Sequence, residues 1–337
     1  MFLSISHKEW DNFYNSSNEY TPYRNESKML DNSSPNSYYV SLCLFIYLNQ
    51  TGAIRITDET DKKLKFLIDT SAFYKCMHES DKGGSLYISC TKGECIQDRI
   101  CSFGSNTVTI GAYCYISVSE EYPFKNYLLG STITSSGEEN PKGSRNVYLY
   151  NGEINIKSIN ISNSKLDGKS SYYVIYSSNS NTTLSTFSNN TDSYETSVVH
   201  TALSIIPEIK TIFCNYLENE CRILISIYGI NLFISNCSFI SNNIKDSYFH
   251  SVSIKIQVKG CFFDISDPDT IGSVIITENI SSIYPENHHL SSGLCFAKLK
   301  LEFPEENNPK TEEKEETLKE DSNLILVQKI TKFHRRR

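Results

Sequence analysis

Three aspartates are the side chains of this sequence whose type and spacing could support acid–base chemistry. Asp264, Asp267 and Asp269 lie within the segment FFDISDPDT. Paired carboxylates can act as acid and base or as nucleophile on a glycosidic bond, and several together can hold Ca²⁺. The segment holds no Arg or Lys that would complete a uronate site, and Asp near Pro268 is typical of a turn. We therefore expect a structural turn here and keep the three only as the catalytic alternative.

A second group of side chains with possible chemistry is formed by four of the eleven cysteines. Cys90, Cys95, Cys101 and Cys114 are separated by four, five and twelve residues. This spacing lacks the C-x-x-C pairs of most zinc sites, so we expect buried thiols or one local disulfide. The sequence also contains no glycine-rich phosphate loop, no G-x-S-x-G and no H-E-x-x-H. No cofactor and no metal ion are predicted.

The elements that would position these residues are strands, because apolar residues alternate along much of the chain. INLFISNCSFISNN and SIKIQVKGCFFDIS each alternate, and each then reaches a Cys and an aromatic residue two places later. Cys237 and Cys261 are 24 residues apart, as are Phe239 and Phe263. This period predicts one turn of a solenoid of stacked strands. The expected core of the repeat comprises Phe187, Cys214, Tyr216, Ile234, Cys237, Phe239, Val258, Cys261 and Phe263.

The same pattern extends towards the N-terminus if the chain is aligned on one large residue per turn. The aligned large residues are Phe73, Leu166, Phe187, Tyr216, Phe239 and Phe263, and Ser or Cys precedes each by two places. Asn190, Asn219 and Asn242 follow three places after their anchors. Asn tolerates the left-handed backbone of a tight turn, and stacked amides can bond along the axis. A Ser-, Gly- and Glu-rich stretch at 125–145 is interpreted as a protruding loop.

The predicted fold class is therefore all-β, a right-handed parallel β-helix, with a β-sandwich as the alternative. Residues 1–37 are expected to cap the coil, with a short helix near residues 8–14 whose aromatic side chains plug the open end. Residues 38–280 would form the β-helix. Residues 281–337, which are polar and acidic and then basic, are expected to be largely disordered.

The net charge and the length of the apolar runs limit the classes of partner that the sequence predicts. The net charge of −7 gives no electrostatic reason to expect a nucleic acid. The apolar runs SLCLFIYL and LILV are too short to cross a bilayer, so no transmembrane segment is predicted. The opening MFLSISHKEW lacks the basic start and long apolar run of a signal peptide.

Three phrases of the sequence carry a family resemblance: the opening EWDNFYNSSNEYTPYRNESKMLDNSSPNSYYVS, then GSLYISCTKGECIQDRICSFG, and later NCSFISNN. They resemble a large expanded family of trichomonad parasite proteins, and the resemblance covers roughly residues 1 to 280. It implies a right-handed parallel β-helix of the pectate-lyase-like type, without an assigned activity, and a place at the cell surface. Many members resemble surface proteins with a transmembrane helix after the β-helix. Here an acidic segment and a basic tail stand in its place, and the family motifs supply no catalytic residue.

Two functions remain open from the sequence. The first is a non-enzymatic structural or interaction protein, adhesin-like, whose long flank presents Asn, Ser and Tyr to a protein or glycan partner. The alternative is a carbohydrate-active enzyme, a polysaccharide lyase or hydrolase, which requires carboxylates from different turns in one groove. Asp264, Asp267 and Asp269 would be its first candidates.

Overall fold

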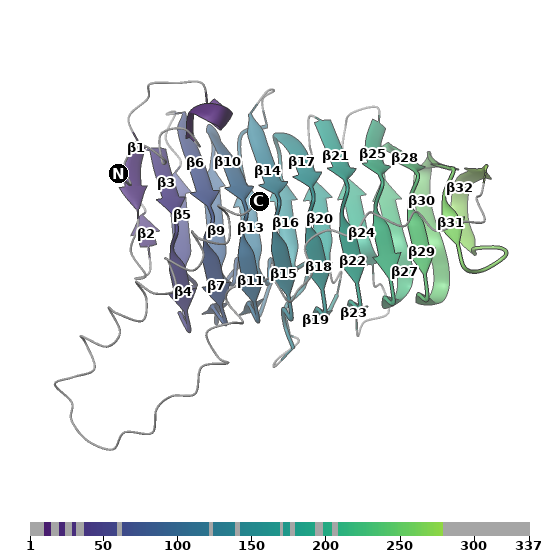
Figure 1. Ribbon diagram of the computed structural model, residues 1–337, viewed down its shortest axis with the longest axis horizontal. Coiled ribbons are helices and arrows are strands. Elements are labelled where there is room, and N and C mark those ends of the chain that lie inside the picture. Colours follow the sequence, from purple (N-terminus) through teal and green to yellow (C-terminus); the bar gives the residue numbers. More distant parts are fainter. Residues whose placement is uncertain are drawn as a thin grey trace, which may run out of the picture.

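The chain folds as an all-β parallel solenoid (Figure 1). The computed structural model describes residues 10–14, 20–23, 29–31, 37–58, 63–120, 124–138, 142–168, 171–175, 179–192, 198–203 and 208–278. Strands pair in parallel with the strands one turn before and one turn after them. The predicted β-helix class is thus confirmed and the β-sandwich, which needs antiparallel pairs, is wrong. The right-handed sense of the coil stays a prediction.

Each complete turn runs through three faces, which we call face 1, face 2 and face 3. Face 1 consists of β2 (Met29–Asp31), β5 (Ile54–Asp58), β9 (Leu86–Cys90), β13 (Cys114–Ser117), β16 (Val147–Tyr150), β20 (Tyr172–Ile175), β24 (Val198–Leu203), β27 (Glu220–Tyr228) and the first part of β30 (Asn243–Lys259). Face 2 consists of β1 (Tyr20–Tyr23), β3 (Ser37–Ser41), β6 (Leu64–Asp69), β10 (Gly93–Asp98), β14 (Lys125–Leu129), β17 (Glu153–Lys157), β21 (Asn179–Thr183), β25 (Glu208–Ile212), β28 (Asn231–Ser235) and most of β32 (Thr270–Thr277). The long strands β30 and β32 bend around the corner and join the two faces into one sheet.

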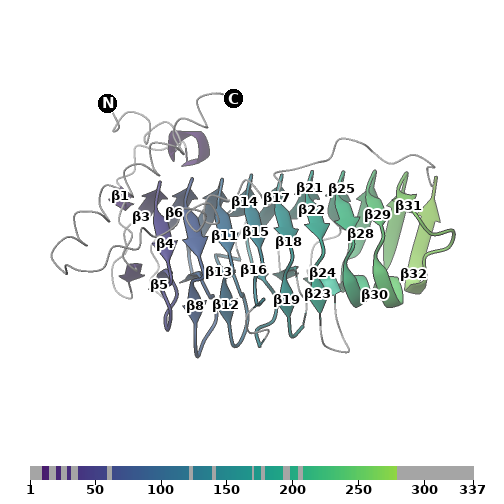
Figure 2. The ribbon, with the colours of Figure 1, turned by 60° about the horizontal axis from the view of Figure 1, so that its bottom comes forward.

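Face 3 is a separate nine-stranded sheet. Its strands are β4 (Leu44–Ile46), β7 (Ala72–Tyr74), β11 (Cys101–Phe103), β15 (Thr132–Thr134), β18 (Asn160–Ser162), β22 (Thr186–Ser188), β26 (Asn215–Leu217), β29 (Ser238–Ile240) and β31 (Phe262–Phe263). Short strands mark the corner that follows face 3, and Figure 2 shows them along one edge of the coil: β8 (Met77–His78), β12 (Asn106–Thr107), β19 (Lys165–Leu166) and β23 (Thr191–Asp192).

The corner between face 2 and face 3 is made by one residue with left-handed backbone in each turn. The column comprises Leu42, Thr70, Arg99, Gly130, Ser158, Leu184, Phe213, Asn236, Gly260 and Glu278, with φ between 44° and 60°. The amide of the corner residue still donates to the next turn, as from Thr70 to the Asp98 carbonyl at 3.0 Å. The coil therefore changes direction without losing a ladder hydrogen bond, which is why non-glycine residues tolerate this conformation.

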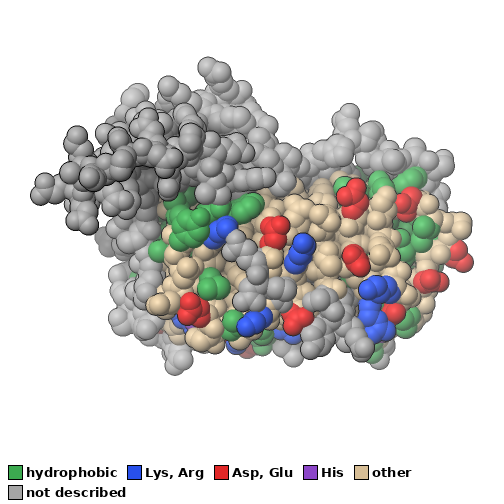
Figure 3. Space-filling model, turned by 90° about the horizontal axis from the view of Figure 1, so that it is seen from below, with side chains coloured by type: hydrophobic (Ala, Val, Ile, Leu, Met, Phe, Trp, Pro, Cys, Tyr) green, Lys and Arg blue, Asp and Glu red, His purple; other side chains and the backbone are tan. Residues whose placement is uncertain are grey.

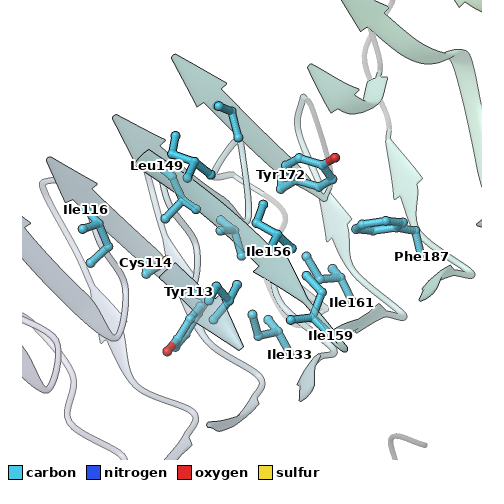
Figure 4. Packing of buried hydrophobic residues seen from close by; sticks show 14 of the residues in the cluster. Tyr113, Cys114, Ile116, Ile133, Leu149, Ile156, Ile159, Ile161, Tyr172 and Phe187 are labelled. Atoms are coloured by element: carbon cyan, nitrogen blue, oxygen red, sulfur yellow. The ribbon is translucent and has the colours of Figure 1, made fainter. Parts of the chain in front are cut away.

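The interior is filled by alternate side chains from all three faces (Figure 4). Face 1 supplies Ile116 and Leu149, face 2 supplies Ile156, and face 3 supplies Ile161 and Phe187, all fully buried. The period of two in the sequence produces this arrangement, because successive side chains along one strand point alternately into the core and out to the surface.

Stacked aromatic rings form a column in face 3. Phe187, Tyr216, Phe239 and Phe263 follow one another at ring-centroid distances of 5.1, 5.0 and 4.6 Å. The residue before Phe187 in this column is Ile161, not the Leu166 used in the sequence alignment. Both are apolar and they lie five positions apart, so the spacing alone did not separate them.

Cysteine thiols form a second internal column, two residues before the aromatic one. Cys214, Cys237 and Cys261 are buried, and the Cys237 amide donates to the sulfur of Cys261 at 3.4 Å. The Cys214 amide does the same to Cys237, also at 3.4 Å. Two further residues of the expected repeat core, Ile234 and Val258, are buried neighbours in face 2. Small polarisable thiols pack at this corner, and in other turns Ser71, Ile100 and Ile159 occupy the same position.

An asparagine column bonds along the axis of the coil. Asn190 donates its side-chain amide to Oδ1 of Asn219 at 3.1 Å, and Asn219 donates to Oδ1 of Asn242 at 3.0 Å. These three do not themselves adopt the left-handed conformation. It falls on the preceding residues Asn189, Glu218 and Ser241, so that part of the interpretation is wrong. The left-handed residue changes the direction of the backbone, and the side-chain amide of the Asn that follows it points inward and bonds along the axis of the coil.

Two local expectations differ from the structure. The stretch 125–145 is not a continuous loop, because KNYLL forms β14 and TIT forms β15, with Leu128 and Ile133 in the core. The expected helix is seen at residues 10–14, but Trp10 and Tyr14 do not plug the end of the coil. They pack on the outer side of face 2, against Tyr39 and its neighbours Leu67 and Ile96. Those outward side chains are apolar and need a cover.

The expected domain limits fall partly on residues outside the described part of the chain. Within 1–37 the structure describes 10–14, 20–23, 29–31 and residue 37, and of the β-helix region it describes strands up to Thr277. The tail predicted for residues 281–337 lies outside the described residues. The three-part organisation stays a prediction.

Candidate functional site

A row of tyrosines on the outer side of face 1 is the most ordered set of chemically useful side chains in the described residues. Tyr87, Tyr115, Tyr148 and Tyr173 are register partners in β9, β13, β16 and β20. Their ring centroids lie 5.3, 4.7 and 5.5 Å apart, with interplanar angles of 17° or less. Tyr150 stacks beside Tyr148 from the same strand. We call these five residues the tyrosine row.

The local sequence explains the row. The strands read LYIS, CYIS, VYLY and YYVI, and in each the residues on either side of the row tyrosine are buried in the core. Alternation then forces the tyrosine outward. Neighbouring strands are about 4.8 Å apart, so in-register rings stack along the axis, which stabilises the pairs by roughly 0.5–1.5 kcal/mol beyond area burial.

Cations cover the faces of the stacked rings. The Arg55 guanidinium carbon lies 4.1 Å from the Tyr87 centroid. The Lys82 ammonium lies 4.7 Å from the ring centre of Tyr115. Arg145 lies 4.3 Å from the centroid of Tyr173 and 5.3 Å from that of Tyr148. Positive charge is attracted to the faces of aromatic rings, so the row and its cations support one another.

The charge balance around the row is positive within a chain of net charge −7. Arg55 pairs with the carboxylate of Asp81. Burial opposes ionisation of Asp81, but hydrogen bonds from the Lys82 amide and from Arg55 hold its pKa below the usual value. Lys82 and Arg145 form no ion pair with a carboxylate among the residues that the structure describes. Two cations are therefore left to attract a negatively charged partner.

The hydroxyls of Tyr115 and Tyr148 stay protonated at neutral pH, because the pKa of each is raised. Burial, with smaller contributions from Tyr87 and Tyr150, raises the pKa of Tyr115 to about 12. Burial also raises the pKa of Tyr148, against the opposing effect of Arg145. These two hydroxyls can thus each donate one hydrogen bond and accept others, but neither is a nucleophile near pH 7. The row is suited to binding rather than to bond cleavage.

Exposure limits which parts of the row a partner could contact. Tyr87, Tyr115 and Tyr150 are partly exposed, whereas Tyr148 and Tyr173 are buried. Because neighbouring rings and cations occupy the ring faces, the accessible parts are ring edges and hydroxyls. A partner would contact a line of edges along the axis of the coil.

A second polar cluster lies on the outer side of face 2, around Glu94 and Lys125. The Lys125 amide donates to Oε2 of Glu94 at 3.3 Å, and its ammonium donates to the carbonyl of Phe13. Burial raises the pKa of Glu94, and Lys125 partly offsets this. The Tyr127 hydroxyl donates to Glu153 at 2.6 Å. The ammonium of Lys125 thus ties the helix at residues 10–14 to the solenoid.

The three aspartates that were considered as alternative catalytic residues lie together at a single corner of the coil. Asp264, Asp267 and Asp269 are exposed between β31 and β32. The Asp264 carboxylate accepts the amide of Ser241, and the Asp269 carbonyl accepts the amide of Tyr248 at 2.8 Å. Both contacts join this corner to the preceding turn of the coil, and a structural role for the three aspartates stays a prediction.

The four-cysteine group does not form one site. Cys90, Cys95 and Cys114 carry free thiols in the interior, whereas Cys101 points to the outer side of face 3 and is disulfide-bonded. A disulfide within the group is therefore wrong. All nine free cysteines of the described residues are buried. No group of His, Cys, Asp or Glu among the described residues could hold a metal ion.

The tyrosine row was not singled out from the sequence. Its signal is the recurrence of Tyr at the second position of LYIS, CYIS, VYLY and YYVI, at spacings of 28, 33 and 25 residues. These irregular spacings hide the register, because the loops between faces differ in length. Figure 3 shows one side of the coil, where the described acidic and basic side chains are scattered without a large patch of one sign.

Comparison with known proteins gives no relative for this chain: no family model, curated protein or solved structure matches it. Within the described part of the chain, no helix combines the length and apolar character needed to cross a bilayer.

Proposed function

We propose that this protein is a non-enzymatic interaction protein that binds an extended acidic glycan along the tyrosine row. The observation that carries the proposal is the in-register stack of tyrosines with cations at its sides. Tyr and Arg are also the residue types that contribute most to binding surfaces.

The periodicity of the row favours a polymer. Its rings recur at 4.7 to 5.5 Å, a spacing close to the length of one sugar unit in an extended polysaccharide. A chain lying along the axis could therefore repeat the same hydrogen bond from turn to turn. Each bond contributes only about 0.5–1.5 kcal/mol net, so several in a line are needed for micromolar affinity.

The cations favour an acidic partner. Lys82 and Arg145 lie against the row and have no carboxylate partner among the described side chains. Carboxylates or sulfates on a glycan would supply that partner. Binding of this kind should weaken as salt rises, because exposed charges are screened over about 8 Å at physiological ionic strength.

A non-enzymatic role is supported by the position of the carboxylates proposed as a catalytic alternative. A glycosidase needs two carboxylates on either side of the scissile bond. Asp264, Asp267 and Asp269 come from one corner of the coil, and the Asp264 carboxylate accepts the Ser241 amide of the preceding turn. The resemblance to the trichomonad family extends the proposal to a surface-associated, adhesin-like role.

The test is binding of the purified protein to an array of neutral, carboxylated and sulfated glycans. Replacing Tyr87, Tyr115 and Tyr150 together by Phe keeps the ring stack and removes three hydroxyls. We expect a loss of affinity of roughly ten- to a thousandfold. Lys82→Gln should weaken binding and reduce its salt dependence, whereas Lys210→Gln, an exposed residue of face 2, is the matched control. Absence of binding to every acidic glycan, or equal binding by the triple Phe variant, would overturn the proposal.

A further inference from the structure

The last turn of the solenoid leaves its core incompletely covered. Val274 and Ile276 of β32 occupy inward positions and pack on the core, yet both remain partly exposed. Their partners one turn earlier, Ile256 and Val258, are almost completely buried. The apolar interior therefore continues to the end of the described coil.

Exposed large apolar side chains gather at the same end. Seven such residues occur in the described chain, and four of them, Val252, Ile265, Ile271 and Ile275, lie between residues 252 and 275. Ile271 and Ile275 are 45% and 44% exposed and point to the outer side of β32. Apolar patches of this kind mark interaction surfaces in soluble proteins.

The backbone of β32 also has a free side. It pairs with β30 through Phe249, His250 and the segment Lys255–Lys259, and with no other described strand. Among the described strands, none pairs with its second edge, whose N–H and C=O groups form a template for another strand. Lys, Pro or an inward charge would protect such an edge, but the sequence SVIIT at 273–277 contains none.

We infer that β32 is the interface through which two copies of this chain join end to end, by antiparallel pairing of residues 273–277 about a twofold axis at Ile275. In this register Ile275 lies opposite its own copy, Val274 opposite Ile276, and Ser273 opposite Thr277. Each pair matches aliphatic with aliphatic or hydroxyl with hydroxyl, as a self-complementary twofold interface requires.

The register also joins the two cores. Val274 and Ile276 are the inward residues of β32, so those of one copy would cover those of the other. Ile271 and Val252, near the corner where β32 bends at Gly272, would lie beside the new interface. The second copy thus covers the apolar surface that the last turn leaves open.

The oligomeric state of the full-length protein tests the inference, measured by light scattering and sedimentation over a range of concentrations. We expect a dimer. Ile275→Lys should raise its dissociation constant by roughly tenfold or more, because like charges would face each other across the axis. Gln257→Lys is the control, since Gln257 is exposed and lies beneath Ile275 in the same column.

A cysteine at the axis gives a second, independent measurement. Directly opposite residues in an antiparallel pair have Cα atoms about 4.5–5.5 Å apart, which suits a disulfide. Ile275→Cys should therefore form a covalent dimer on mild oxidation, and Gln257→Cys should not. A monomeric wild type with the β32 amides protected from hydrogen exchange would overturn the inference and assign the edge to another part of this chain. A dimer that persists unchanged in Ile275→Lys would also overturn it.

Discussion

The side-chain amide of Asn219 donates to Oδ1 of Asn242 at 3.0 Å, one turn further along the coil. The same amide also donates to the Phe187 carbonyl at 2.9 Å, and Oδ1 of Asn219 accepts the backbone and side-chain amides of Asn190, each at 3.1 Å. One buried residue therefore links three successive turns of the coil.

Replacing Asn219 should destabilise the coil strongly. Asn219→Ala leaves the amides of Asn190 and the Phe187 carbonyl without this partner, and each unsatisfied buried group costs about 1–3 kcal/mol. We expect a loss of about 3 kcal/mol in the free energy of unfolding, measured with urea. Asn155→Ala, on the outer side of face 2, is the control and should change stability by about 0.5 kcal/mol or less. Equal effects of the two substitutions would contradict the role of the column.

The aromatic column of face 3 makes a comparable prediction for packing. Phe239 is fully buried and stacks on Tyr216 and Phe263 at 5.0 and 4.6 Å. Phe239→Ala should therefore cost about 3–5 kcal/mol, because the cavity lies between stacked rings. Phe233 is only half-buried on the outer side of face 2, so Phe233→Ala should cost clearly less. Urea unfolding of both variants measures the two losses in free energy of unfolding. A larger loss for Phe233→Ala than for Phe239→Ala would contradict the packing, because it would mean that the outward side of β28 faces the core.

The sequence allowed the solenoid to be predicted where its turns are most regular. Between Cys214 and Phe263 the same Cys-x-aromatic pattern recurs after 23 and 24 residues, and the structure places those residues in stacked columns. Earlier turns have loops of different length. There, the alignment on Leu166 was wrong, because strand pairing places Ile161 in that position.

The tyrosine row could not be predicted because it depends on two facts that no short segment contains. Alternation places Tyr115 outward only once Cys114 and Ile116 are known to point inward. The stacking of Tyr115 on Tyr148 then depends on the register between two residues that lie 33 positions apart in the chain. The cluster of Asp264, Asp267 and Asp269 could be found from the sequence, because its members lie within one short segment.

The buried thiols predict the response of the fold to alkaline pH. Burial raises the pKa of Cys76, Cys90 and Cys114 to about 12 each, from the usual 9. The folded state then keeps protons that the unfolded chain releases above pH 9. Their contribution to stability is therefore complete below about pH 9 and is lost progressively towards pH 12.

Urea unfolding between about pH 7 and pH 10.5 measures this loss. At one pH unit above the unfolded pKa each such thiol would lower the free energy of unfolding by about 1.4 kcal/mol. Cys114→Ala should be less stable at pH 7 but should show a shallower fall with pH. A wild-type stability that stays constant up to pH 10.5 would contradict the raised pKa values.

The single tryptophan makes the docking of the helix at residues 10–14 measurable. Trp10 is buried against Tyr39, with ring centroids 6.2 Å apart, and against Tyr14 at 4.6 Å. Its fluorescence should be blue-shifted and protected from acrylamide in the native protein. Lys125→Gln removes the ammonium that donates to the Phe13 carbonyl and lies near the Tyr14 ring, so it should increase quenching of Trp10. Lys210→Gln should not change the quenching of Trp10, because Lys210 lies on face 2 far from this helix in the chain.

If Lys125→Gln increased the quenching while urea unfolding of the coil stayed unchanged, the helix would be shown to detach as a local unit, because the stacked turns do not depend on it. Native fluorescence typical of an exposed indole would show that the helix does not cover face 2.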